Sequence, residues 1–219
     1  MNTKGASVVR SFVVRSLIKF KRNFTQNSLF AAFMWSIRGF KVPAPNFIKW
    51  KRMRENFIHN AFCVETGTYL GETTSFLSSF SNHVTTIEPS QVLFKYSVEK
   101  FKNRQNVEVL NGTSEDLLEE ILKKIPDKTN VNFWLDGHFS GDVTFEGLLH
   151  SPIKLELALI EMSLPRLGHV VIAVDDFREF NVGSASAYPS RDFLVQWAVA
   201  NNLLWDVQLD MFFMKKDLQ

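Results

Sequence analysis

A carboxylate and two glycines follow closely where an apolar run of the chain ends. Phe62–Val64 leads into Glu65, and Gly67 and Gly71 come next, separated by three residues. Glycine tolerates the left-handed backbone of a tight turn and lets a ligand lie against bare backbone. A strand, a tight turn and a helix start in this order are typical of a nucleotide-type cofactor site in an open α/β sheet.

The glycine spacing indicates which kind of cofactor such a site would take. A dinucleotide site usually reads G-x-G-x-x-G, so that several backbone N–H groups reach a pyrophosphate. This chain reads G-x-x-x-G, with Thr68 and Tyr69 after the first glycine. S-adenosylmethionine contains adenosine but no phosphate, and it needs no pyrophosphate cradle. The motif alone is equally compatible with a structural turn, so the rest of the chain has to decide.

Two later segments carry polar residues that suit the same cofactor. Glu88 lies 21 positions after Gly67 at the end of the next predicted strand, where a carboxylate can accept hydrogen bonds from both ribose hydroxyls. The third predicted strand ends before Ser114 and Glu115. Ser114 is expected to be a helix N-cap, and the same loop is expected to contact adenine.

Acids also end the fourth and fifth predicted strands. Asp136 and His138 follow one apolar run, and Asp175 and Asp176 follow another. If these strands are neighbours, their backbones lie only ~4.8 Å apart, so the three carboxylates would repel one another. A divalent metal, the positive groups of the cofactor or a protonated His138 could compensate them. His138 is a candidate general base; the alternative is a loop histidine bonded to a carboxylate.

Alternating elements are predicted to position these residues. The alternation of strands and helices predicts a parallel sheet with helices on both faces. The predicted strands are 61–66, 83–88, 107–111, 131–136, 169–175 and a final strand or strand pair in 204–215; the predicted helices are 47–59, 73–79, 91–101, 114–124, 152–163 and 191–201.

The first part of the chain differs strongly in charge from the rest. Residues 1–60 contain 12 Lys and Arg and one acid, a net charge of +11, whereas residues 61–219 contain 13 and 22, a net charge of −9. Val9–Phe24 has one apolar and one basic face at helical spacing. It is predicted to be a helix that packs on the domain, contacts an anionic membrane or acts as a targeting peptide. The prolines near residue 43 predict a boundary between an extension, residues 1–42, and a domain, residues 43–219.

Several classes of protein are disfavoured by composition. The single cysteine, Cys63, excludes an internal disulfide. The sequence contains no run of about 18 uncharged apolar residues, so no membrane-spanning helix is expected. The chain contains no C-x-x-C or H-E-x-x-H zinc motif and no G-x-S-x-G nucleophile motif. A cytoplasmic protein is expected, with peripheral contact to the inner membrane surface as an open alternative.

Five segments in order resemble class I S-adenosylmethionine-dependent methyltransferases, closest to small bacterial enzymes of glycan and secondary-metabolite biosynthesis. They are Glu65-Thr-Gly-Thr-Tyr-Leu-Gly-Glu-Thr-Thr74, Ile87-Glu-Pro89, Phe133-Trp-Leu-Asp-Gly-His-Phe-Ser-Gly141, Ser151-Pro-Ile-Lys-Leu-Glu-Leu157 and Val174-Asp-Asp176. The resemblance covers roughly residues 43–215. It implies a Rossmann-like, doubly wound, mostly parallel seven-stranded sheet whose last strand is antiparallel, and these cofactor-binding residues: Glu65, Thr66, Gly67, Tyr69, Gly71, Thr73, Glu88, Ser114, Glu115 and Asp136.

A more distant likeness is to the sugar O-methyltransferases of macrolide pathways. It implies magnesium bound by Asp136, Asp175 and Asp176, with His138 as the base. The sequence therefore predicts O-methylation of a sugar or glycan hydroxyl, with S-adenosylmethionine as cofactor and Asp136 and His138 as catalytic residues. The alternatives are an NAD(P)-dependent oxidoreductase and a non-catalytic module that binds an anionic membrane or polymer. No specific nucleic-acid partner is expected, and homo-oligomerisation stays open.

Overall fold

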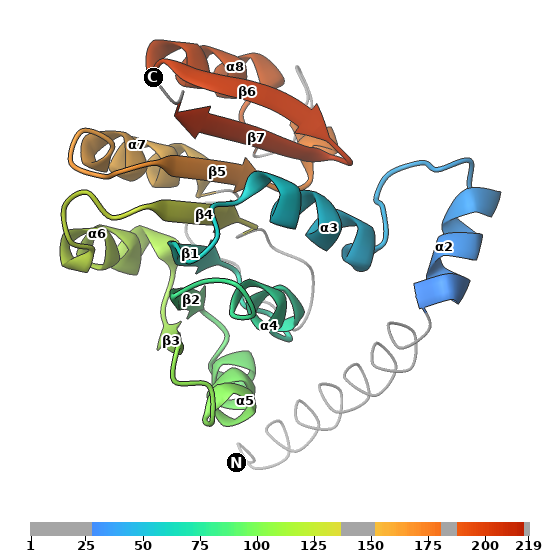
Figure 1. The fold of residues 1–219 in the computed structure, drawn as a ribbon, viewed down its shortest axis with the longest axis horizontal. Coiled ribbons are helices and arrows are strands. Elements are labelled where there is room, and N and C mark those ends of the chain that lie inside the picture. Colours follow the sequence, from blue (N-terminus) through green and yellow to red (C-terminus); the bar gives the residue numbers. More distant parts are fainter. Residues whose placement is uncertain (1–27, 137–151, 181–187, 217–219) are drawn as a thin grey trace, which may run out of the picture.

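The computed structural model describes residues 28–136, 152–180 and 188–216. Its centre is a seven-stranded sheet with the order β3-β2-β1-β4-β5-β7-β6 (Figure 1). β7 runs antiparallel to both of its neighbours, and the pairs among β1 to β5 are parallel. The strands are β1 Phe62–Thr66, β2 His83–Glu88, β3 Val107–Asn111, β4 Val131–Leu135, β5 Val170–Val174, β6 Leu203–Gln208 and β7 Met211–Lys216.

The central strands are apolar on both faces because helices cover both. Every residue of β4 and of β5 is buried, as expected for parallel strands inside an α/β sheet. In the register of the sheet, Thr66 pairs with Ile87 and with Leu135, and Leu135 pairs with Val174. The four strands therefore end level with one another, and the residues that follow them meet at one edge.

Helices form a layer on each side of this sheet (Figure 1). One core lies between the sheet and α6, α7 and α8, and includes Leu118, Leu157 and Leu194. A second core lies on the other side, where Met53 of α3 and Leu77 of α4 pack. The helices are α2 Ser28–Ile37, α3 Asn46–Asn56, α4 Glu72–Leu77, α5 Gln91–Phe101, α6 Ser114–Lys124, α7 Ile153–Ser163 and α8 Arg191–Ala200, with a 3-10 turn η1 at Phe177–Glu179.

The two described helices of the basic N-terminal part, α2 and α3, differ in how they pack. α3 belongs to the sheet domain, since its Met53 is fully buried and Trp50 stacks on Phe76 of α4. α2 lies apart from the sheet, beyond the carboxyl ends of β4 and β5 (Figure 1). The helix predicted at Val9–Phe24 lies outside the described residues. Among the helices described, none is both long and apolar enough to cross a membrane.

The structure confirms the predicted fold and corrects one detail. The bounds of β2, β3, α5 and α6 are those predicted, and 204–215 forms a strand pair. The N-cap of α6 is Thr113, not Ser114, which is the first residue of the helix. The Thr113 hydroxyl donates to Asp116 Oδ2 at 2.9 Å and no side chain caps the helix. The prediction failed because two adjacent hydroxyl residues both suit an N-cap.

Candidate functional site

The loop between β1 and α4 is bonded to the end of β2. The amides of Gly67 and Thr68 both donate to the Ile87 carbonyl at 3.1 Å, and the Gly71 amide donates to the Thr68 carbonyl at 2.8 Å. Gly67, Tyr69 and Gly71 have positive φ angles of 91°, 50° and 65°, so the turn uses both glycines as the sequence predicts. The amide hydrogens of Gly67, Thr68 and Gly71 are thus already bonded within the protein.

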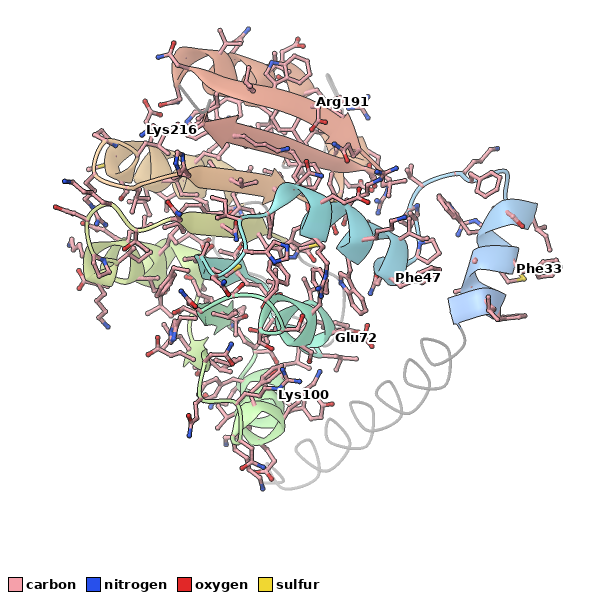
Figure 2. The ribbon with its side chains drawn as sticks, viewed as in Figure 1. Phe33, Phe47, Glu72, Lys100, Arg191 and Lys216 are labelled. Atoms are coloured by element: carbon pink, nitrogen blue, oxygen red, sulfur yellow. The ribbon has the colours of Figure 1, made fainter. Side chains whose placement is uncertain are left out.

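α5 packs against the loop between β1 and α4. A Cβ on Gly71 would lie 2.6 Å from the Phe101 ring, so the helix start packs directly on α5. Lys100 extends from α5 toward the start of α4 at Glu72 (Figure 2), and its Nζ donates to the carbonyls of Leu70 and Gly71 at 2.6 and 2.7 Å. Burial lowers the pKa of Lys100. This lysine fixes the loop through its backbone, a role that sequence patterns did not reveal.

Glu88 lies where the sequence predicts it, at the end of β2 beside the glycine loop. Its carboxylate is 3% exposed and accepts from the Tyr69 amide at 2.7 Å and from the Ser90 amide at 2.8 Å. Burial raises its pKa to about 7 in spite of these two bonds. Tyr69 thus contributes its backbone here, and each Glu88 oxygen keeps a lone pair for a further donor.

Glu65 is wholly buried at the end of β1. Its Oε2 accepts from the Thr74 hydroxyl at 2.5 Å, whereas Oε1 has no hydrogen-bond partner in the part of the chain that the structure describes. Burial raises the pKa of Glu65 to about 8. A buried oxygen without a donor is destabilising, so such a group in a native protein needs an explanation such as a catalytic role, a water or an ion.

A third buried acid, Glu156 of α7, was not among the predicted site residues. It is 2% exposed, and its Oε1 also lacks a partner among the described residues. Burial raises its pKa to about 7, the charges of Glu115 and Asp136 raise it further, and the Ser114 and Thr66 hydroxyls oppose this. The structure therefore gathers four predicted residues around it. Its sequence signal was an acid within the apolar face of α7, which otherwise consists of Ile153, Leu157 and Ile160.

We call Glu65, Glu88 and Glu156 the acid cluster. Within the described ranges, no Lys or Arg forms an ion pair with any of the three. Thr73, another predicted cofactor contact, lies in the first turn of α4 and is partly exposed.

The acids after β5 are arranged differently, because a lysine lies between them. Lys49 Nζ of α3 contacts both oxygens of Asp175, at 2.5 and 2.7 Å, and lies 4.0 Å from Asp176 Oδ1. The Lys49 and Asp175 side chains are 9% and 10% exposed. Burial raises the pKa of Asp175 to about 7, the charge of Asp136 adds to this, and Lys49 opposes it. The positive charge expected beside these carboxylates is thus supplied by Lys49 of the chain itself.

This arrangement does not fit the predicted magnesium site. Magnesium needs carboxylate oxygens that are free to coordinate it, but both oxygens of Asp175 already accept from Lys49. Among the described residues, no group of three or more His, Cys, Asp and Glu side chains could hold a metal ion. Asp136 does reach the predicted edge, where its amide donates to the Thr66 carbonyl at 3.1 Å. Metal ligation by Asp136, Asp175 and Asp176 would require Lys49 to move away.

Arg178 holds the remaining acids on this side. Its Nη1 donates to Asp176 Oδ1 at 2.7 Å and also pairs with Asp210 in the turn between β6 and β7, while its amide donates to Asp210 Oδ1 at 2.7 Å. Lys49, Asp175, Asp176, Arg178 and Asp210 are called the ion-pair cluster below. Nearby, burial and the charges of Asp176 and Asp136 raise the pKa of the Tyr188 hydroxyl. His138, the predicted base, lies outside the described residues.

Comparison with known proteins gives similar folds at low sequence identity. No protein-family model and no curated protein sequence matches the chain. A putative rRNA methylase from Clostridium thermocellum is 11% identical with a TM-score of 0.50 over 76% of this chain and 93% of that one. An rRNA methylase from Streptococcus thermophilus is 16% identical, TM-score 0.48, over 82% and 99%. A SAM-dependent methyltransferase from Aquifex aeolicus is 16% identical, TM-score 0.47, over 75% and 86%. The strand order, the antiparallel β7 and the likeness to the Clostridium thermocellum protein agree on the fold: the chain has a Rossmann-like fold of the kind found in that methylase.

Proposed function

We propose that the protein is an S-adenosylmethionine-dependent methyltransferase that acts on a hydroxyl group, with a sugar or glycan as the acceptor class. The observation that carries the proposal is the acid cluster. Three carboxyl groups from β1, β2 and α7 are buried at this edge of the sheet without an ion pair to any Lys or Arg among the described residues, and burial raises their pKa values. Such a site favours a ligand with positive charge and hydrogen-bond donors.

S-adenosylmethionine fits this donor set, and when bound it supplies a methyl group activated by a positively charged sulfur. Glu88 would accept from the ribose hydroxyls through its remaining lone pairs. Glu65 would use its unpartnered oxygen for the amino group, directly or through water. Glu156, with the Thr66 and Ser114 hydroxyls beside it, adds negative charge on the α7 side.

The glycine loop argues against the dinucleotide alternative. A pyrophosphate needs free backbone N–H groups, but the amides of Gly67, Thr68 and Gly71 donate to carbonyl oxygens and the Tyr69 amide donates to Glu88. A pyrophosphate would also carry negative charge into buried carboxylates. Both effects disfavour an NAD(P)-dependent oxidoreductase.

The acceptor side favours a neutral, hydroxyl-rich molecule over a nucleic acid. Asp136 presents a carboxylate there, and carboxylate oxygens accept readily from hydroxyl groups. A phosphate backbone binds where Lys and Arg are in excess. Residues 61–219 carry a net charge of −9 and residues 1–60 a net charge of +11, so a nucleic acid would have to bind through the basic segment and not through these carboxylates. Removal of the hydroxyl proton is assigned to His138, and the chain otherwise acts by positioning the two reactants.

Calorimetric titration of the full chain with S-adenosylhomocysteine and, separately, with NAD⁺ tests the cofactor assignment. Binding of the first without the second is expected, and the reverse would overturn the proposal. Mass spectrometry of a panel of sugars and RNA fragments incubated with S-adenosylmethionine then tests the acceptor class. A mass gain on RNA alone would refute the sugar assignment. An excess of chelator should leave turnover unchanged if Lys49 occupies the metal position.

A further inference from the structure

α2 presents an apolar face to solvent instead of burying it. Four large side chains on one side of the helix are exposed: Leu29, Phe33, Met34 and Ile37, with Leu29 at 81%, Ile37 at 63% and Phe33 at 59%. At 100° per residue these positions span an arc of about 140°. Figure 2 shows Phe33 on α2 away from the sheet. Just after the helix, Phe40 and Val42 extend the same exposed apolar surface, at 61% and 41%.

The rear of α2 is tied to its own following turn. Trp35 Nε1 donates to the Lys41 carbonyl at 2.9 Å, and the Trp35 ring packs edge-on against Phe40 with centroids 5.0 Å apart. These contacts join the helix to the turn that follows it and do not use Leu29, Phe33, Met34 or Ile37. An exposed face of this kind in one continuous segment marks an interaction surface.

Charge indicates the occupant of this surface. α2 itself contains no charged residue, Arg38 and Lys41 follow it directly, and the first 54 residues contain no acid. Two copies of the chain joined through α2 would bring like charges together, whereas an anionic surface would neutralise them. A helix of 10 residues spans only ~15 Å, about half of a bilayer core, so it would lie in the plane of the interface.

We propose that α2 and the turn after it, residues 28–42, dock the protein on an anionic lipid bilayer. The apolar side chains enter the boundary between headgroups and acyl chains, and Arg38 and Lys41 contact acidic headgroups. Because α2 lies beyond the carboxyl ends of β4 and β5 (Figure 1), docking would place the acceptor side of the sheet near the bilayer.

Co-sedimentation of the full chain with two kinds of vesicle tests this proposal. Vesicles of phosphatidylcholine with phosphatidylglycerol should bind the protein, and pure phosphatidylcholine should bind it much less. High salt should weaken the binding because it screens the headgroup charge. The double variant Phe33→Ser and Ile37→Ser should bind the anionic vesicles at least roughly tenfold more weakly. The matched control, Met162→Ser with Val199→Ser, alters apolar residues of similar exposure on α7 and α8 and should bind normally.

Three outcomes would overturn the proposal. Equal binding to both vesicle types, or none to either, would exclude an anionic lipid partner. Unchanged binding of the Phe33→Ser and Ile37→Ser variant would assign lipid contact to another segment. A change from oligomer to monomer in this variant, measured by light scattering without lipid, would assign the surface to a second copy of the chain. Titration with S-adenosylhomocysteine checks that each variant remains folded, and its result does not depend on lipid.

Discussion

The two groups of acids at the carboxyl edge of the sheet differ in how their charge is compensated. In the acid cluster, Glu65, Glu88 and Glu156 are buried with hydroxyl or amide donors and without an ion pair to the described part of the chain. In the ion-pair cluster, Lys49 and Arg178 form ion pairs with Asp175, Asp176 and Asp210. We therefore propose that the first group binds a positive ligand, whereas the second holds the fold together.

This difference predicts that the two clusters affect different properties, ligand affinity and folding stability. Buried ion pairs seldom add stability overall, but removal of one partner leaves a buried charge and is strongly destabilising. Substitutions in the ion-pair cluster should therefore reduce folding stability. Substitutions in the acid cluster should reduce ligand affinity and leave the fold intact.

The largest effect is expected for Lys49→Met, which leaves Asp175 buried beside Asp136. The free energy of unfolding at pH 8.5, where Asp175 is ionised in the parent protein, should fall by about 3–5 kcal/mol, measured by urea denaturation. The loss should be smaller at pH 5, where Asp175 takes up a proton. Lys51→Met, at an exposed position on the same helix, is the control. Addition of Asp175→Asn should restore part of the loss, and equal losses for Lys49→Met and Lys51→Met would remove the distinction between the clusters.

In the acid cluster, Glu65→Gln should weaken S-adenosylhomocysteine binding by about 1–3 kcal/mol, because a charged acceptor is replaced by a neutral amide. Calorimetry measures the affinity, and urea denaturation should show an unfolding free energy close to that of the parent. Glu108→Gln, an exposed acid of β3, serves as the control. A large loss of stability with unchanged affinity would mean that Glu65 is purely structural.

Binding should also depend on pH in the direction set by the raised pKa values. Glu65 has a pKa of about 8, and Glu88 and Glu156 have pKa values of about 7, so the free site holds protons at pH 6. The positively charged S-adenosylmethionine favours the ionised form of these acids. Its affinity should therefore rise roughly tenfold between pH 6 and pH 8.5. Proton release should make the binding enthalpy differ between phosphate and Tris buffers. Identical enthalpies in the two buffers would contradict this.

The same pKa values affect the stability of the free protein with a defined sign. Each of these acids has a higher pKa in the folded state than its ordinary value of 4.5. The folded state therefore binds more protons than the unfolded one between those pH values, and stability should fall as pH rises from about 4.5 to about 8.

The smallest effect is expected for Gly71→Ala, and comparison with Gly39→Ala distinguishes side-chain packing from backbone strain. Gly71 and Gly39 have nearly equal φ angles, 65° and 66°, but a Cβ would meet Phe101 only at Gly71. Gly71→Ala should therefore reduce the unfolding free energy by about 1 kcal/mol more than Gly39→Ala does. Equal losses would show that the Phe101 ring moves aside freely.

The strands and the glycine loop could be predicted because their signals are local. The apolar runs before Asp136 and Asp175 predict buried strands, and parallel strands that end level bring the following residues to one edge. Glu88 could be placed for the same reason. The hydroxyl-acceptor class and the catalytic role of His138 stay predictions.

Lys49 could not be predicted, because no local pattern links a lysine in a basic helix to an acid 126 residues later. Its sequence context suggests a solvated face, and only the packing of α3 on the sheet brings the two together. Glu156 is intermediate. Its position within the apolar face of α7 was visible in the sequence, but which neighbouring acids it meets depends on the arrangement of the whole edge.

The distance along the chain between Lys49 and Asp175 also affects how the protein is made. Ribosomes add about 5–20 residues per second, so roughly 6–25 s separate the synthesis of the two residues. During that interval α3 has neither the carboxylate that neutralises its lysine nor β7, whose Phe213 joins Met53 in the same core. α3, the first helix of the domain, can therefore complete its packing only after β7, the last strand, has been synthesised. A nascent chain that stops before β5 should leave α3 as a basic, partly apolar segment open to chaperones.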